Sequence, residues 1–372
     1  MLNLSDSTLR ESNKHTISTK ISSDGTQAYL VYQISISEDE SILAAELFDV
    51  SSDKLKTVSI YVPEDLSYPI IRGGSASEDF SIFTIIESTN DQNNGKIRVR
   101  TLKRGIDENS HKLLVIAETY INCIIKGFCP RGGIFVDNKY ILVHSVVEDS
   151  TNQKSKIWLL NINDLSLYSS LVVNGIITSD VIMIKPKGVI GISFCMSQGI
   201  YDMNSLHINW KPDYKLMLYK IDENKKTFVK CTEKKLSYGG ISITSTFYNK
   251  WYITIGTHLL TNSQLCIYSI DKNWELYLEK SSKINSSIEN IKISNNCKYY
   301  LLSHRIHPYT DFSSSVIQVG TDIFNLDIIN PIIPTNIYTS FDCDENFKKI
   351  IITCSNDNNY SNKNIFLYTF NK

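Results

Sequence analysis

Two short patterns recur along the whole chain, and their spacing is the feature that most limits what it can fold into. The first pattern is an apolar alternating stretch that ends in Ile or Phe followed by Asp or Asn. Its five copies end at Asp49, Asn163, Asp222, Asp271 and Asn371. The intervals between these ends are 114, 59, 49 and 100 residues, so halving the two large ones gives a unit of about 50–60 residues. A fixed period of this size is typical of repeat architectures.

The second pattern is a polar turn followed by a stretch of aromatic and β-branched residues. Its seven apolar stretches are Ala28–Tyr32, Phe80–Ile85, Tyr140–His144, Val189–Phe194, Trp251–Ile255, Tyr299–Leu302 and Ile350–Thr353. Seven units in 372 residues average about 53 residues each, which agrees with the period of the first pattern. The two patterns therefore predict seven copies of one structural unit.

Composition favours β-structure for this unit. The chain has 52 Ile but only 5 Ala, together with 21 Tyr and 14 Phe. Isoleucine packs well on a pleated sheet and alanine is the best helix former, so this ratio predicts an all-β chain. Codons for Ile, Asn, Lys and Tyr are AT-rich, which indicates an AT-rich source genome, but codon bias would not place the Ile at alternate positions.

Each unit contains four strands, joined by a polar turn, a long polar loop and an Asp/Asn turn. Four-stranded antiparallel units repeated radially form a β-propeller, because each unit buries its faces against its neighbours. The sequence predicts one all-β domain over residues 1–372, a seven-bladed propeller. The expected blades are 14–65, 66–120, 121–175, 176–235, 236–285, 286–335, and 336–372 together with 1–12. The last unit is one strand short, so Leu2–Arg10 is predicted to join it as the outermost strand and leave no open edge.

The blade pattern resembles known families of propellers. The Ser23-Asp24-Gly25 opening and the repeated Ile-Asp steps are similar to seven-bladed propellers of the WD40 and lactonase-like groups. The chain lacks the Trp-Asp and Gly-His dipeptides of WD40 repeats, and its glycine pairs are not followed by the kelch Tyr and Trp. The resemblance implies the blade architecture and no particular subfamily.

The lactonase-like resemblance also implies a possible cation site. Those enzymes bind a divalent cation with carboxylate and amide groups, and this chain has such groups at equivalent turns: Asp79, Asn138, Asn249, Asn296 and Asp344. Asp and Asn are also ordinary turn residues, which we favour as the interpretation here. We expect no metal ion and no cofactor.

Other catalytic signals are absent from the sequence. It contains no phosphate-binding glycine loop and no Gly-x-Ser-x-Gly nucleophile elbow. His304 and His307 are close in sequence but fall on opposite faces of a strand. His144, His258 and His304 each end a second strand, and could meet on one face of the propeller, although strand ends commonly carry polar residues.

Basic side chains beside glycine pairs give the best candidate binding surface. Arg72 and Arg131 each precede a Gly-Gly pair, just before the inner strands of blades two and three. Lys185 and Tyr238 are expected at similar points in the next two blades. We predict that these four residues, with the three strand-end histidines, form a small rim that binds an acidic peptide or anion. Solvated charges beside tight turns would give the same pattern.

Charge and cysteine usage limit the partners and the compartment. The chain has 38 basic and 39 acidic residues and a net charge of -1, which gives no global attraction to nucleic acid or anionic membrane. Its eight cysteines form no Cys-x-x-Cys pair and lie mostly in apolar stretches. No apolar stretch is long enough for a membrane span, and no secretory signal is evident. We expect a cytoplasmic protein, monomeric by itself, with reduced thiols.

The sequence favours a non-catalytic interaction platform whose faces and loops bind other proteins. The alternative is an enzyme that uses a central channel, such as a lactonase-like hydrolase, with residues that the sequence does not assign. A carbohydrate-binding propeller ranks last, because the four Trp residues do not recur once per blade.

Overall fold

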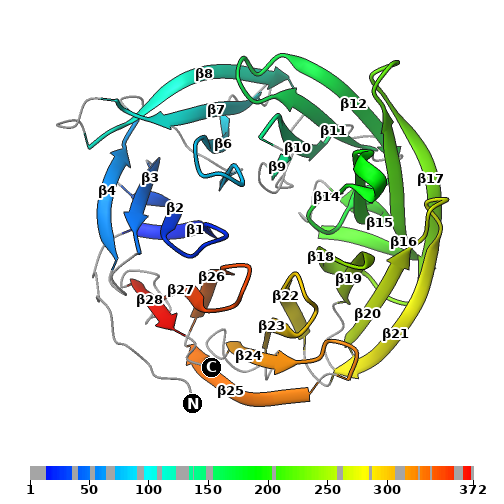
Figure 1. Ribbon diagram of the computed structural model, residues 1–372. Helices are drawn as coiled ribbons and strands as arrows, with labels where there is room; N and C mark the ends of the chain where they lie inside the picture. The colour runs from blue at the N-terminus through cyan, green and yellow to red at the C-terminus, as the bar shows by residue number, and fades with distance from the viewer. Residues whose placement is uncertain are drawn as a thin grey trace. The chain divides into compact units, whose positions relative to one another are not determined.

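Strands make up most of the chain in the computed structural model (Figure 1). The structure describes residues 14–35, 41–50, 55–63, 72–89, 96–106, 111–122, 134–136, 138–147, 154–202, 207–257, 263–284, 287–305, 315–325, 327–335, 337–355 and 363–369. The chain divides into two compact units. The first comprises Met1–Val143, Leu159–Leu167 and Asn336–Lys372, and the second comprises His144–Trp158 and Tyr168–Thr335.

Three sheets lie within the first unit. One contains β1 (Lys14–Ile21), β2 (Gln27–Ser35), β3 (Ser41–Asp49) and β4 (Lys56–Tyr61) in that order. The next contains β5 (Arg72–Ala76), β6 (Phe83–Thr89), β7 (Lys96–Arg104) and β8 (Leu113–Asn122). The third contains β26 (Ile337–Cys343), β27 (Lys349–Ser355) and β28 (Lys363–Thr369).

Three more sheets lie within the second unit. The first has two short inner strands, β13 (Ile176–Ile177) and β14 (Ile182–Ile184), which both pair with β15 (Gly191–Asp202), followed by β16 (His207–Asp222) and β17 (Thr227–Leu236). The second contains β18 (Gly240–Tyr248), β19 (Lys250–Thr257), β20 (Ser263–Ile270) and β21 (Leu276–Ile284). The third contains β22 (Ser287–Ile293), β23 (Tyr299–Arg305), β24 (Ser315–Thr321) and β25 (Asp327–Thr335).

A seventh sheet has residues in both units. It contains β9 (Ile134–Val136), β10 (Tyr140–Val146), β11 (Lys154–Asn161) and β12 (Leu167–Asn174), joined in chain order. A short 3-10 turn, η1 (Pro186–Gly188), connects β14 to β15. The predicted all-β chain of seven successive antiparallel blades is therefore confirmed.

The two sequence patterns correspond to fixed places in these sheets. The seven polar-turn stretches lie at β2, β6, β10, β15, β19, β23 and β27, which are the second strands. The Ile-Asp ends close third strands, as at Asp49 in β3 and Asp222 in β16. Phe80 is an exception: it was expected to begin a strand, but it lies in the turn before β6 with φ of 54°.

Apolar cores lie between neighbouring sheets within each unit. In the first unit, Tyr29 and Leu47 of the β1–β4 sheet pack with Phe83 and Leu102 of the β5–β8 sheet. In the second unit, Leu218 of the β16 strand packs with Ile255 of β19. Because neighbouring sheets cover each other, residues on both faces of the central strands are buried, and adjacent apolar runs such as Ala28–Tyr32 follow from this.

The last sheet bears on the predicted closure of the ring. The last sheet shows three strands, β26 to β28, as the sequence predicted for residues 336–372. The predicted fourth strand, Leu2–Arg10, lies outside the described residues. Among the residues that the structure describes, no helix is long and apolar enough to span a membrane.

Gly320 gives a direct test of the packing in β24. Its register partner is Tyr300, which is 1% exposed, and a Cβ at residue 320 would lie 1.9 Å from Cζ of that ring. We predict that Gly320→Ala lowers the free energy of unfolding by about 1–3 kcal/mol, because the ring must move within a packed core. Urea titration followed by circular dichroism measures this. Leu278→Ala, at a side chain that is 55% exposed, is the control and should have almost no effect; equal losses in both variants would contradict the packing argument.

Candidate functional site

The predicted rim residues do not all lie where the sequence placed them. Arg72 is the first residue of the inner strand β5, and Tyr238 lies between β17 and the inner strand β18. His304 lies one residue before the end of β23. Arg131 and His258 lie outside the described residues. Because Arg72 and Tyr238 belong to different units, the structure describes each within its own sheet only.

Lys185 differs from its predicted position. It follows β14 and comes directly before η1, so it lies at the hairpin after the inner strand and not in front of it. The Pro186–Gly188 turn lies where the sequence pattern put it, between the first and second strands, and Lys185 directly precedes that turn. Lys185 is therefore at the C-terminal end of its inner strand, whereas Arg72 is at the N-terminal end of β5. The inner strand itself is interrupted between β13 and β14, where the Ser179 hydroxyl accepts a hydrogen bond from the Cys195 N–H at 2.8 Å.

His144 is also placed differently from a rim residue. It lies within β10 and is 5% exposed, so the ring is not presented at the surface. Among the described residues, no group of three or more His, Cys, Asp or Glu side chains is arranged to hold a metal ion.

Three of the turns have Asp or Asn side chains that are hydrogen-bonded within the turn itself. In the turn between β5 and β6, Ser77 donates its hydroxyl proton to Asp79 at 2.7 Å and accepts the N–H of Ile82 at 3.0 Å. Ser22 and Asp24 form the same arrangement between β1 and β2, as do Ser294 and Asn296 between β22 and β23. These contacts occupy oxygens that a cation would need.

The pKa values of these turn carboxyls follow from their contacts. Hydrogen bonds from Ser22 and Thr26 lower the pKa of Asp24 below its ordinary value. Burial raises the pKa of Asp79, but hydrogen bonds from Ser77 and Ser81 outweigh it and the net pKa is lowered. Asp344 is the exception, because burial raises its pKa above the ordinary value despite backbone hydrogen bonds. The first two carboxylates therefore stabilise their turns when ionised.

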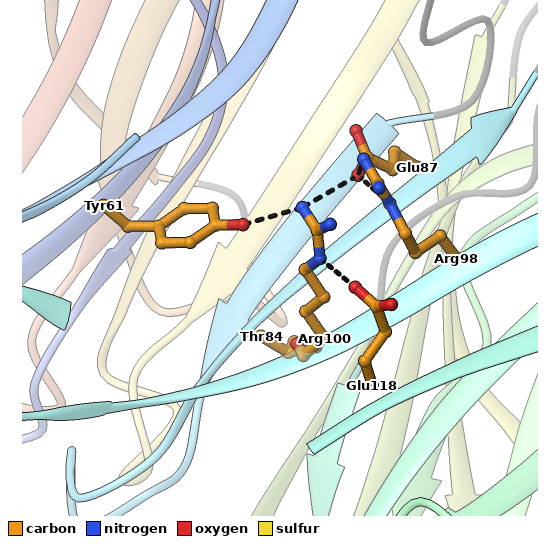
Figure 2. A network of polar contacts seen from close by, with 6 residues as sticks. All are labelled: Tyr61, Thr84, Glu87, Arg98, Arg100 and Glu118. Atoms are coloured by element: carbon orange, nitrogen blue, oxygen red, sulfur yellow. Dashed lines mark hydrogen bonds and ion pairs between the residues drawn. The ribbon is translucent and has the colours of Figure 1, made fainter. Parts of the chain in front are cut away.

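A buried network of charges lies where the β1–β4 and β5–β8 sheets meet (Figure 2). Glu87 at the end of β6 is 1% exposed and accepts a hydrogen bond from Nε of Arg98 on β7 at 2.5 Å. A second nitrogen of Arg98 also forms an ion pair with this carboxylate. Glu87 and Arg98 are register partners, so the alternation of the two strands brings them to the same face.

Arg100 continues the network toward the neighbouring sheet. Its Nη1 donates to the Tyr61 hydroxyl of β4 at 2.7 Å and lies 3.5 Å from Oε1 of Glu87. Its Nε binds the Glu118 carboxylate of β8, its register partner. Burial would lower the pKa of Arg100, but the contacts with Glu118, Tyr61 and Glu87 raise it. The guanidinium therefore remains charged in the protein interior.

The network fixes the packing of these two sheets. It contains two guanidinium and two carboxylate groups, so the charges balance. Nearby, Tyr29 of β2 donates its hydroxyl proton to the Thr84 carbonyl at 3.1 Å, and the Thr84 hydroxyl donates to the Arg100 carbonyl at 2.9 Å. Full pairing leaves these groups suited to structural support rather than to catalysis.

Sequence reasoning missed this network although a signal was present. Arg98 and Arg100 occupy alternate positions on either side of Val99, which places both arginines on one face of the strand. Glu87 and Glu118 lie on the two flanking strands. Arg72, a predicted rim residue, lies on β5 and is the register partner of Glu87 on β6. The backbone of Arg72 therefore lies at the same end of the sheet as the charged network.

Comparison with known proteins adds the class of fold. No family model and no curated protein matches the sequence. A solved structure described as "Structure of Dos1 propeller" matches with a TM-score of 0.57 and 11% identity, covering 99% of this chain and 95% of that one. At this identity the likeness shows the fold alone. The chain has the fold of a seven-bladed β-propeller.

The buried charges give a prediction for stability. Glu87→Gln removes the carboxylate shared by Arg98 and Arg100, and leaves buried guanidinium groups without their counter-charge. We expect the free energy of unfolding to fall by about 3–5 kcal/mol, as when one partner of a buried ion pair is removed. Urea denaturation measures the change.

The exposed pair Lys250–Glu279 provides the matched control. Its Nζ–Oε1 distance is 2.6 Å, but its side chains are 45% and 33% exposed. Glu279→Gln should cost at most about 1 kcal/mol, because water and salt screen an exposed pair. A loss for Glu87→Gln no larger than that for Glu279→Gln would show that the buried network does not hold the two sheets together.

Proposed function

We propose that this β-propeller is a non-catalytic platform that binds other proteins. The observation that supports the proposal is the set of apolar side chains left exposed on outer strands. On β8, Leu114, Val115 and Ile116 are 48%, 44% and 43% exposed, and Tyr120 is 49% exposed. Neighbouring apolar side chains in contact with water are typical of surfaces that partner proteins cover.

The outer strand of the adjacent sheet extends this surface. Ile60 at the end of β4 forms a parallel bridge with Lys112, and its N–H donates to the His111 carbonyl at 2.9 Å. Val62 follows in the chain and is 53% exposed. Apolar side chains of two sheets therefore lie together along this edge, within the first unit of the chain.

A second surface of the proposed platform is the predicted rim. Within the first unit it comprises Arg72, the first residue of β5, and Arg131, which precedes β9 in the sequence, and we expect it to bind an acidic segment of a partner. Lys185 is not included, because it lies at the other end of its inner strand.

The state of the cysteines supports a reducing compartment for this platform. Cys195, Cys231, Cys266, Cys297 and Cys343 are free thiols among the described residues. Burial raises the pKa of Cys195 to about 12 and that of Cys297 to about 11, so both thiols stay protonated and unreactive. Buried reduced cysteines are typical of proteins of the cytosol, where we place this one.

The rim can be tested by charge reversal. Partner proteins are first co-purified with the tagged wild-type chain from its native cell. We expect the double variant Arg72→Glu with Arg131→Glu to recover about fivefold less of these proteins, because two attractive charges become repulsive. Quantitative mass spectrometry of the co-eluting proteins measures retention. Lys235→Glu on β17, an exposed lysine outside the rim, is the control and should leave retention unchanged.

The two parts of the proposal have different contradicting results. Recovery of the wild-type chain alone, with no protein in proportion to it, would contradict the platform. Recovery of partners that both charge variants retain equally would contradict the rim and leave the apolar edge of β8 as the binding surface.

A further inference from the structure

Three hairpins that follow inner strands lie side by side in the second unit. The middle one is the tight turn between β18 and β19, with Asn249 at φ of 61°. On one side, the Ser245 hydroxyl donates to the Met183 carbonyl of β14 at 3.2 Å. On the other side, the Thr246 hydroxyl donates to the Ser294 carbonyl, at the start of the β22–β23 turn, at 3.2 Å. These bonds hold the three turns at one end of the unit.

The middle hairpin exposes two aromatic side chains. Phe247 is 54% exposed and Tyr248 is 45% exposed, and the Phe247 ring lies 5.5 Å from that of Trp251 between centroids. At three corresponding turns of other sheets the apolar residue is buried: Phe80 is 7%, Cys297 is 5% and Phe347 is 3% exposed. Val189, after the β14–β15 turn, is 39% exposed. Packing of the fold therefore does not account for the exposed pair.

All three of these neighbouring turns contain lysines. The β14–β15 turn contains Lys185 and Lys187, the middle hairpin contains Lys250, and the β22–β23 turn contains Lys298. Residues 185–190, 247–251 and 294–299 include no Asp or Glu. Two equivalent turns of the first unit are different, because residues 22–26 and 77–82 contain Asp24, Glu78 and Asp79 and no basic residue. The β26–β27 turn of that unit has both signs, with Asp344 and Glu345 before Lys348.

Nearby carboxylates neutralise only part of this charge. Glu279 pairs with Lys250, and the hydrogen bond between them raises the pKa of that lysine. Farther out, Asp271 accepts the N–H groups of Asn273 and Glu275 within its own turn. Lys187 and Lys298 are exposed, on the two turns that flank the middle hairpin.

We propose that Phe247, Tyr248, Lys187, Lys250 and Lys298, together the lysine–aromatic patch, form a docking site for an acidic linear segment of a partner protein. An apolar residue of that segment packs on the two rings while its carboxylates pair with the lysines. Aromatic side chains commonly anchor such contacts, and complementary charge sets the orientation and the rate of association. The inference rests on the proposed function: it adds one binding surface to the proposed platform and gives the chemistry of the segment that binds there.

Single-stranded nucleic acid is the other polymer with stacking groups and negative charge. The lysine–aromatic patch is less suited to it, since the chain carries a net charge of -1 and nucleic-acid sites need extended basic surface. It is therefore one outcome of the test below.

The experiment selects a display library of random linear peptides against the full chain, and then measures binding of the enriched peptides by fluorescence anisotropy. We expect the enriched peptides to carry several Asp or Glu residues around an aromatic or aliphatic residue. Phe247→Ser with Tyr248→Ser, and separately Lys187→Glu with Lys298→Glu, should each weaken binding by about tenfold or more. Tyr277→Ser with Leu278→Ser is the matched control, because these side chains on β21 are 53% and 55% exposed.

Each result decides the inference. Enriched acidic peptides that lose affinity in both patch variants but not in the β21 variant support it. The inference is overturned if the enriched peptides are basic or uncharged, if no peptide is enriched, or if all variants bind the peptides equally. It is also overturned if the chain binds a labelled oligothymidylate and the patch variants abolish that binding. Peptides that bind regardless of the patch variants leave the proposed platform intact, so failure of the patch and failure of the platform are distinguishable.

Discussion

Burial between neighbouring sheets is the constraint on which the rest of the structure depends. The β1–β4 sheet has apolar side chains on both faces, and within the first unit one face packs on the β5–β8 sheet and the other on the β26–β28 sheet. The rings of Tyr29 and Phe83, from adjacent sheets, are tilted by 32° with centroids 4.8 Å apart, and both residues are 1% exposed. Burial of this kind is the dominant favourable term in folding. A single sheet would leave such residues in water.

Polar contacts make this apolar packing specific. The Glu87–Arg98–Arg100–Glu118 network and the Tyr61 hydroxyl link two sheets at positions where an apolar core alone would permit sliding. A second junction uses one carboxylate: Asp342 of β26 accepts the Ile21 N–H at 3.0 Å and lies 3.6 Å from the Lys20 ammonium. Interior charges therefore stabilise the fold, and the exposed apolar side chains described above lie on outer strands and hairpins.

Local patterns of the sequence predicted the strands and turns because their causes are local. The apolar patterns predicted the second and third strands of the sheets. The Ser–Asp arrangement of residues 22–24 and 77–79 forms its turn within five residues. Cross-strand partnership is different, since the register of Glu87 with Arg98 depends on the loop between them as well as on the two strands. The interruption between β13 and β14 likewise involves a contact between strands, from the Cys195 N–H to the Ser179 hydroxyl. The position of Lys185 was predicted wrongly for a local reason, because this residue directly precedes the turn that follows its inner strand.

Native-state hydrogen exchange tests the central claim, that no sheet is stable without its neighbour. The informative amides are those of Leu30 and Val31 in β2 and of Ile85 and Ile86 in β6, which belong to adjacent sheets and are buried. If the sheets depend on each other, these amides exchange only through one shared opening and report the same free energy. Amides of one sheet that exchange through their own opening, while those of the other stay protected, would contradict the account.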